Sequence, residues 1–320
     1  MEIIDAQVHT WDFDRPDFPW QLNTGDAATD ARRREHFGAH TVTAGQLLAA
    51  MNTSGVDAAL AVSLPIYGFS NAYALHAAAQ GAGRIGVVGL INPELPDVEE
   101  KVKHWRATPG MLALRTTPYI DREVESVRRG PMRRVLAAAQ RHNVPMCVYP
   151  PGRLAEMEAL ARDFPDLQFI VDHIGLPQPP VICDLSPEPF KGFEGLLRLA
   201  AYPNVAVKAT GLPSLSHDQF PFRDTWSALL QVIDAFGPAR VMWGTDFTRV
   251  PVPYREGVKY IGNAGDFSAP ERAQIMGGTL RKIFRWQPAV CSLQQECTST
   301  MKPAARHNRN EGNAYEKKHP

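Results

Sequence analysis

The chain has 320 residues, of which 44% are hydrophobic and 21% charged, and its 34 basic and 34 acidic side chains give a formal net charge of zero. This composition is typical of a soluble globular protein with a large core, and no apolar run approaches the length of a membrane-spanning helix. The balanced charge gives no reason to expect nucleic acid, an anionic membrane or a polyanion as a partner.

The chain opens on a strand-like segment, IIDAQVHTW, at residues 3–11. Side chains alternate along a strand, so Gln7 and His9 share one face and Val8 takes the other. Two polar groups on one face of a buried strand need partners there or a chemical role. A polar connection rich in Asp, Arg and Pro follows over residues 12–40. A structureless connection of that length is expected to be functional, for instance as a lid that lines a pocket.

Strand-like and helical segments then alternate along the chain. The later strands are predicted at residues 56–65, 85–93, 111–118, 144–151, 167–175, 205–211 and 240–247. Helical patterns begin near residues 43 and 71, cover 98–105, 132–142, 154–164, 190–201 and 226–236, and recur after residue 268. Thr43 with Gln46 and Ser268 with Glu271 are capping-box signatures, and Asn71 is a predicted N-cap.

Eight strands, most of them followed by a helix, predict a parallel sheet with right-handed crossovers. They suit one (β/α)8 TIM barrel over residues 1–286, since such barrels typically have about 250 residues. A doubly wound open sheet is the alternative, and the lack of a Gly-rich phosphate loop after the first strand weakens it. Residues 287–320 have no periodicity, which predicts a disordered or irregular tail without chemistry.

Several polar residues fall at the carboxyl ends of the predicted strands, where barrels of this type place their active sites. They are Gln7, His9, Arg115, Tyr149, His173 and Asp246, with Arg249 just beyond the last strand. Each alone could be a hydrogen-bonded core residue, a turn cap or part of an ion pair. Two histidines and an aspartate at one rim favour a catalytic site.

Four motifs at these strand ends together resemble the amidohydrolase superfamily. They are D-A-x-x-H at residues 5–9, N-x-Y at 71–73, D-H-x-G at 172–175 and G-x-D-[FW] at 244–247. More narrowly, the pattern resembles the amidohydrolase-related branch, which contains lactonases of the 2-pyrone-4,6-dicarboxylate type and decarboxylases. The resemblance covers residues 3 to about 285.

The family's usual metal site is only partly retained. It uses His-x-His on strand one, a His on strands five and six and an Asp on strand eight. Here Gln7 replaces the first His and Tyr149 the strand-five His, whereas His9, His173 and Asp246 remain. Gln is a poor transition-metal ligand, although three protein ligands can hold zinc. Lactonases of this branch that work without metal also have Arg on strand four and Tyr on strand five, so no cofactor is favoured; Zn or Mn on the three retained residues is the alternative.

The resemblance and the residues together predict a hydrolase of a lactone, or of a similar ester-like carbonyl, in a small carboxylated substrate. Asp246 is expected to take a proton from the attacking water. His9, His173 and the Gln7 amide are expected to stabilise the developing oxyanion.

Arg115 and Tyr149, with Arg249 as a further clamp, are expected to hold the substrate carboxylate. Two alternatives stay open at this point. One is a metal-dependent hydrolase or non-oxidative decarboxylase of a small unsaturated or aromatic acid. The other is a barrel that binds a small acid without catalysis.

Two further features concern location and assembly. Glu2 and Asp5 stand where a signal peptide would carry positive charge, so no such peptide is expected. Neither metal-ligand pairing nor a disulfide framework is visible among Cys147, Cys183, Cys291 and Cys297. These observations predict a cytoplasmic location. A homo-oligomer remains open.

Overall fold

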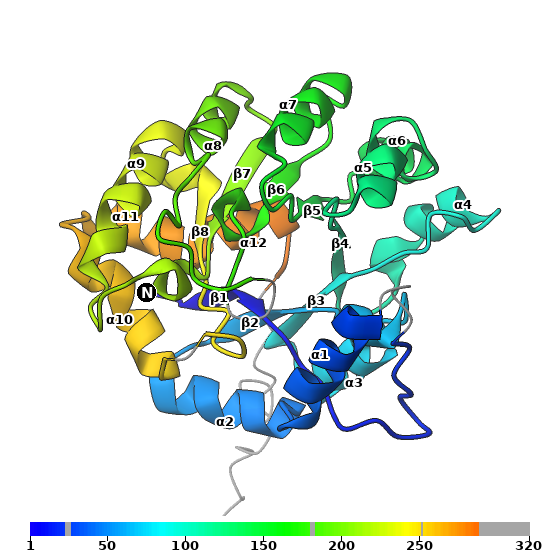
Figure 1. The fold of residues 1–320 in the computed structure, drawn as a ribbon, viewed down its shortest axis with the longest axis horizontal. Helices are drawn as coiled ribbons and strands as arrows, with labels where there is room; N and C mark the ends of the chain where they lie inside the picture. Colours follow the sequence, from blue (N-terminus) through cyan, green and yellow to red (C-terminus); the bar gives the residue numbers. More distant parts are fainter. Residues whose placement is uncertain (23–26, 180–182, 251, 288–320) are drawn as a thin grey trace, which may run out of the picture. The chain divides into compact units, whose positions relative to one another are not determined.

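The computed structural model describes residues 1–22, 27–179, 183–250 and 252–287. Eight strands lie in chain order as a parallel sheet, with helices around them (Figure 1). The strands are β1 (Ile4–Val8), β2 (Ala58–Val62), β3 (Ile85–Gly89), β4 (Met111–Thr116), β5 (Met146–Val148), β6 (Phe169–Val171), β7 (Val205–Ala209) and β8 (Val241–Trp243). The predicted (β/α)8 barrel is confirmed. The predicted tail, apart from residue 287, lies outside the described residues.

Hydrogen bonds tie the last strand back to the first. The Asp246 N–H donates to the Gln7 carbonyl over 2.9 Å, and the Thr245 N–H donates to Asp5 Oδ1 over 2.9 Å. Gly244 makes this approach possible, because a Cβ there would lie 2.9 Å from the Ala6 nitrogen. The glycine of the G-x-D motif therefore brings Asp246 next to the residues of β1.

The helices confirm the predicted alternation and add three elements. They are α1 (Ala27–Gly38), α2 (Ala44–Ser54), α3 (Ala72–Gln80), α4 (Val98–Lys103), α5 (Asp121–Arg128), α6 (Met132–Arg141), α7 (Leu154–Asp163), α8 (Glu194–Arg198), α9 (Trp226–Phe236), α10 (Tyr254–Ala264), α11 (Ala269–Ala273) and α12 (Thr279–Phe284). The sequence analysis missed α1, α5 and α10. Within the part of the chain that the structure describes, no helix has the length and apolar character needed to cross a bilayer.

Helix α1 corrects the expectation that residues 12–40 lack regular structure. Its sequence is polar on nearly every side, so it carries no apolar stripe that would reveal it. Its end is held by the Trp11 side chain, whose Nε1–H donates to the carbonyls of Phe37 (3.2 Å) and His40 (2.8 Å). The aromatic residue that follows β1 thus holds α1 near the carboxyl end of that strand.

Two of the three predicted helix starts are capped as expected. Thr43 and Ser268 form capping boxes with Gln46 and Glu271. Asn71 precedes α3, but its side chain makes no cap. Instead its Nδ2 donates to the Leu90 carbonyl and its Oδ1 accepts from the Leu90 N–H, both over 2.8 Å. This asparagine therefore ties α3 to the end of β3.

The barrel interior is closed at its amino end by the last helix. Leu280, Phe284 and Trp286 pack with interior residues such as Ile4 and Leu60 in one buried cluster. The outer faces of the strands pack against the surrounding helices in a second, larger cluster. The apolar plug leaves the carboxyl end of the barrel as the place for polar groups.

Candidate active site

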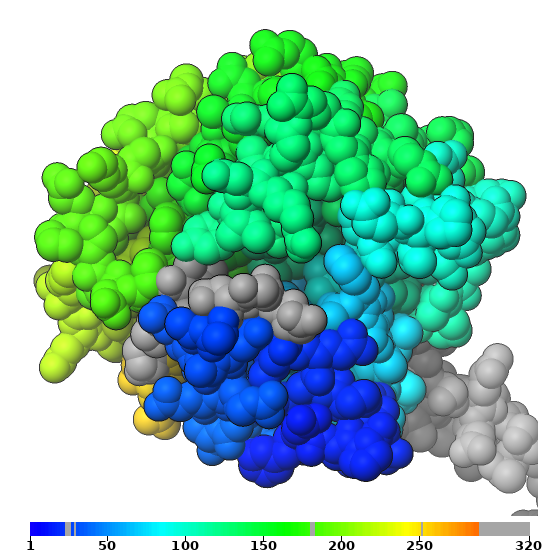
Figure 2. All heavy atoms as spheres, turned by 45° about the vertical axis from the view of Figure 1, so that its right-hand side comes forward, coloured from blue at the N-terminus to red at the C-terminus, as the bar shows by residue number. Residues whose placement is uncertain are grey.

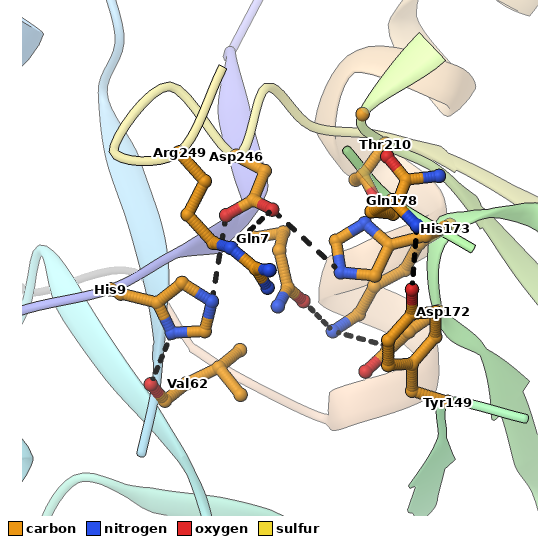
Figure 3. Close-up of polar contacts among 12 residues, drawn as sticks. Gln7, His9, Val62, Tyr149, Asp172, His173, Gln178, Thr210, Asp246 and Arg249 are labelled. Carbon is orange, nitrogen blue, oxygen red and sulfur yellow. Dashed lines mark hydrogen bonds and ion pairs between the residues drawn. The ribbon is translucent and has the colours of Figure 1, made fainter. Parts of the chain in front are cut away.

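The predicted acid and both predicted imidazoles meet at the carboxyl end of the barrel (Figure 3). Asp246 Oδ1 lies 3.5 Å from His9 Nε2, and Asp246 Oδ2 lies 3.8 Å from His173 Nε2. The Arg249 Nε lies 4.0 Å from Asp246 Oδ2. His9, His173 and Asp246 are each buried from solvent. Residues more than 200 positions apart in the chain are therefore brought to one point.

The backbone at two of these residues is unusual. Asp246 has φ 53° and His173 has φ 54°, a left-handed conformation that side chains with a Cβ rarely adopt. Such conformations cost on the order of 1–3 kcal/mol and concentrate at functional sites. Here each one turns the chain just after a strand, at the point where its side chain faces the other two.

The hydrogen bond of His9 fixes which nitrogen carries its proton. Its Nδ1 lies 2.8 Å from the Val62 carbonyl, which can only accept, so Nδ1 is the protonated nitrogen. Burial lowers the pKa of His9 well below its usual value, and Arg249 and Arg115 lower it further. A neutral His9 then presents a bare Nε2 lone pair to Asp246. It can accept a proton there but cannot donate one, unlike the oxyanion donor expected from the sequence.

His173 is held by Thr210, whose Oγ1 lies 2.9 Å from His173 Nδ1. Burial lowers the pKa of this histidine well below its usual value, against the opposing effect of Asp172. Its ring packs edge-on against the Tyr149 ring, with 4.9 Å between centroids. Among the described residues its Nε2 has no hydrogen-bond partner. That nitrogen is therefore available to a ligand beside Asp246.

Asp246 is electrostatically suited to exchange a proton near neutral pH. Burial raises its pKa from 3.8 to about 7, although Arg249 and Arg115 act in the opposite direction. Asp5 behaves similarly: burial raises its pKa to about 6, while its hydrogen bonds with Thr245 oppose the rise. A general base works best when its pKa lies near the working pH.

The side chain of Gln7 is held by a buried lysine that the sequence analysis missed. Lys208 Nζ donates to Gln7 Oε1 over 2.8 Å and lies 3.0 Å from Asp172 Oδ1. Asp172 Oδ2 in turn accepts from Arg115 Nε over 2.8 Å. The available signal for Lys208 was a charged residue inside the apolar strand VAVKATG, and for Asp172 its place in the D-H-x-G motif.

The hydroxyl of Tyr149 is already used within the protein. It donates to the Leu176 carbonyl (3.2 Å) and accepts from the Gln178 N–H (3.0 Å). Its ring lies 5.6 Å from the Arg115 guanidinium carbon. Tyr149 thus holds the loop after β6 and supports Arg115. Because its hydroxyl already has two partners, the predicted contact of Tyr149 with the substrate has less support than the predicted contacts of Arg115 and Arg249.

Helix α1 adds two groups that the sequence analysis did not assign to the site. Electrostatic interactions link Arg33 to Arg249 and to Glu123 on α5. Burial and the nearby Arg249 lower the pKa of His36. Figure 2 shows the blue N-terminal residues and the green middle of the chain on the same face of the molecule. Positive charge from α1 therefore lies beside Arg249.

The residues around Asp246 fit a divalent metal ion poorly. His9, His173 and Asp246 are the candidate ligands, yet the Gln7 oxygen is bound by an ammonium group and a guanidinium lies against Asp246. Three basic side chains, Arg115, Lys208 and Arg249, already lie around the site, beside the carboxyl groups of Asp172 and Asp246. No group of three or more His, Cys, Asp or Glu arranged to hold a metal ion occurs among the described residues.

A parallel eight-stranded barrel with an acid and two imidazoles at its carboxyl end places this protein among the (β/α)8-barrel proteins that carry a polar site at that end. The sequence matches the Amidohydrolase family over residues 4–286, and the chain belongs to that family. The predicted resemblance is thereby confirmed.

Relatives and solved structures resemble most of the chain. L-fucono-1,5-lactonases from Burkholderia multivorans and Burkholderia ambifaria are each 25% identical, over 88% of this chain and 95% of their own length. An amidohydrolase from B. multivorans with bound Zn has a TM-score of 0.70 at 22% identity, covering 90% of this chain and all of that one. A probable 2-pyrone-4,6-dicarboxylic acid hydrolase from Acinetobacter baumannii with citric acid bound has a TM-score of 0.70 at 13% identity, covering 89% and 100%. The structural similarities establish the fold, and one of these relatives holds a metal.

Proposed function

We propose that this protein hydrolyses a lactone, or a closely similar ester, of a small carboxylated molecule, with Asp246 as the general base. The observation that carries the proposal is the buried Asp246 carboxyl, with a pKa of about 7, beside the bare His9 Nε2. The names of the two lactonase relatives support a lactone as the reacting group, and the largely buried arginines support a carboxylate elsewhere in the substrate.

The proposed reaction begins with a water bound between Asp246 and His9. Both groups accept hydrogen bonds, so together they orient the lone pair of the water toward the substrate carbonyl. The water oxygen bonds to the carbonyl carbon while its proton passes to Asp246. Collapse of the tetrahedral intermediate then breaks the ring C–O bond, and Asp246 returns the proton to the departing oxygen. Asp246 is thus a base in the first step and an acid in the second.

The developing oxyanion needs donors that the imidazole of His9 does not provide. We assign this role to the Gln7 amide, with His173 Nε2 contributing when it carries a proton. Each donor of this kind is typically worth about 2.7–4 kcal/mol. The substrate carboxylate is assigned to Arg115 and Arg249, and the positive charge of Arg33 on α1 favours the same anion. The Tyr149 ring supports Arg115, whose guanidinium carbon lies over it at 5.6 Å from the ring centroid.

The pH dependence of kcat/KM is expected to report Asp246. The base must be ionised, so kcat/KM should fall about tenfold per unit below pH 7 and level off above it, instead of falling below pH 4. Arg249→Gln removes a charge that lowers the pKa of Asp246, so the midpoint should move to higher pH. Initial rates across pH 5 to 9 on a substrate that does not titrate there give the profile; a midpoint near pH 4 would contradict the assignment.

The reaction is proposed to proceed without a metal. The ammonium of Lys208 is hydrogen-bonded to Gln7, which stands at a usual ligand position, and the guanidinium of Arg249 lies 4.0 Å from Asp246; both positive charges disfavour a further cation. Protein purified without added ions is expected to hold far less than one Zn or Mn per chain, and a chelator should leave kcat unchanged. About one tightly bound ion per chain, with activity lost on its removal, would support a metal-dependent enzyme.

Turnover of a lactone panel tests the proposed function directly. Wild-type protein and Asp246→Asn are compared on sugar lactones and on carboxylated lactones, with acid release and CO2 release both measured. Asp246-dependent acid release without CO2 is the expected result. CO2 release would indicate a decarboxylase, and binding of a small acid without any turnover would indicate a binding protein.

A further inference from the structure

We propose that Lys208 and Asp172 are positioning residues that hold the Gln7 amide and the Arg115 guanidinium as two fixed donors for the oxygens of the substrate. The inference rests on the proposed hydrolysis and extends it to residues that lie below the reacting groups. Lys208 would act through Gln7, and Asp172 would act through both Lys208 and Arg115.

Lys208 is a fully buried lysine inside the barrel, with 0% of its surface exposed. A buried ammonium is costly unless it is paired and hydrogen-bonded. Its two partners come from different strands: Gln7 Oε1 on β1 at 2.8 Å and Asp172 Oδ1, just after β6, at 3.0 Å. The lysine therefore links β1 to the end of β6 across the interior of the barrel.

The ammonium decides which way the Gln7 amide points. An ammonium only donates, so the atom of Gln7 that faces Lys208 must be the oxygen. The NH2 group is then the other end of the amide, and within the described part of the chain Gln7 Nε2 has no hydrogen-bond partner. Without Lys208 the amide could rotate and present its oxygen to the substrate carbonyl, where an acceptor would oppose the oxyanion.

Asp172 extends the same arrangement to Arg115. Its Oδ2 accepts from Arg115 Nε over 2.8 Å, and the Tyr149 ring lies against the guanidinium. One edge of the guanidinium is thus held, while Arg115 Nη2 is buried without a partner among the residues that the structure describes. Two donor groups, one at each end of the chain Gln7–Lys208–Asp172–Arg115, are therefore preorganised and unsatisfied.

Two buried donors without partners among the described residues call for a ligand rich in oxygen acceptors. Leaving such donors unsatisfied costs about 1–3 kcal/mol each, more when the group is charged, and a bound acceptor recovers this energy. A lactone carbonyl on Gln7 and a carboxylate on Arg115 would meet this requirement. The substrate we infer is thus a carboxylated lactone whose carboxylate and reacting carbonyl engage separate donors.

A double-mutant cycle on kcat tests the pairing of Lys208 with Gln7. Gln7→Ala is expected to lower kcat by about 10²–10³-fold, the usual effect of one oxyanion donor. Lys208→Met should lower kcat by at least tenfold. The double variant should be no slower than Gln7→Ala alone, because Lys208 acts through Gln7. Lys259→Met, an exposed lysine on α10, is the matched control and should keep wild-type kcat.

A second variant keeps the test decisive if Lys208→Met does not fold. Gln7→Glu retains an acceptor for Lys208 but removes the Nε2 donor, so it should melt near the wild-type temperature and lose at least as much kcat as Gln7→Ala. The inference is overturned if Gln7→Glu keeps wild-type kcat, or if the effects of Gln7→Ala and Lys208→Met multiply. Asp246→Asn is measured alongside. If Asp246→Asn loses activity while Gln7→Glu does not, only the positioning role fails; if Asp246→Asn also keeps wild-type kcat, the proposed function fails.

Binding gives a readout that needs no turnover. Citrate, an oxygen-rich acid, is titrated into the wild type and the same variants by calorimetry. Gln7→Ala and Lys208→Met are each expected to raise the Kd at least tenfold, the double variant no further than Gln7→Ala, and the control Lys259→Met should keep the wild-type Kd. If the wild type binds citrate and Lys208→Met leaves the Kd unchanged, the positioning role is wrong even for a chain that hydrolyses no lactone.

Discussion

Replacing Asp246 with asparagine is expected to lower kcat for lactone hydrolysis by roughly 10²–10⁴-fold, the range typical of a general base. Asparagine has nearly the same shape but cannot accept the proton of the attacking water. KM should change little, because the arginines assigned to the substrate carboxylate remain. Steady-state rates at pH 8, where Asp246 is ionised in the wild type, measure the effect.

The matched control is Asp234→Asn, on the exposed face of α9, which should leave kcat within about twofold of the wild type, because a surface charge change of this kind perturbs little. If Asp246→Asn keeps more than a tenth of the wild-type kcat, Asp246 is not the base.

The same Asp246→Asn substitution is expected to stabilise the protein at alkaline pH. The pKa of Asp246 rises from a reference value of 3.8 to about 7 in the folded protein. Between these pH values the folded protein holds a proton that the unfolded chain has released. The ionised carboxyl therefore destabilises the fold progressively from pH 4 to 7 and fully above pH 7. At about 1.4 kcal/mol per pKa unit, the gain for asparagine approaches roughly 4 kcal/mol. Melting curves at pH 5 and pH 8 should show the larger gain at pH 8.

Replacing Asp172 with asparagine is expected to destabilise the protein by about 3–5 kcal/mol, the cost of breaking a buried ion pair. The carboxylate is fully buried between Lys208 and Arg115, at 3.0 and 2.8 Å, and its loss leaves two buried cations without their counter-ion. At about 2–4 °C per kcal/mol, the Tm should fall by roughly 10 °C at pH 7. Calorimetric melting measures this.

A surface ion pair provides the control for Asp172→Asn. Asp163 pairs with Arg133 over 3.0 Å with its side chain 42% exposed, and Asp163→Asn should cost less than about 1 kcal/mol. The pair with Lys208 and Arg115 keeps the pKa of Asp172 well below its usual range against the effect of burial. Its stabilisation is complete above pH 4 and is lost only in strong acid, so the difference between the variants should narrow below that pH. Equal melting temperatures at pH 7 would contradict the buried-pair account.

The sequence predicted the barrel and its rim because both follow from local patterns. Short apolar runs between helical segments indicate parallel strands, and polar residues at the ends of those runs indicate the carboxyl face. His9, His173 and Asp246 were each placed by one strand end, and the topology alone brings such ends together. Alternation along β1 also gave Gln7 its place on the same side as His9.

The other features of the site depend on contacts between residues far apart in the sequence, which no local pattern contains. The tautomer of His9 is set by the Val62 carbonyl on the neighbouring strand, and this changes the histidine from a donor to an acceptor. The orientation of the Gln7 amide is set by Lys208, which lies 201 positions away in the sequence. Helix α1 has too few apolar residues to produce a periodic signal, although the fold places it beside Arg249.

The plug formed by Leu280, Phe284 and Trp286 has a consequence for biosynthesis. The first strand emerges from the ribosome early, yet its neighbours from β8 and α12 are made last, and the Glu2–Arg281 ion pair spans 279 positions. The free edge of β1 has no partner until Asp246 has been made, and the amino end of the barrel has no apolar plug until Trp286 has been made. A nascent chain of this protein therefore exposes apolar barrel-lining residues during most of its synthesis, a state that favours aggregation.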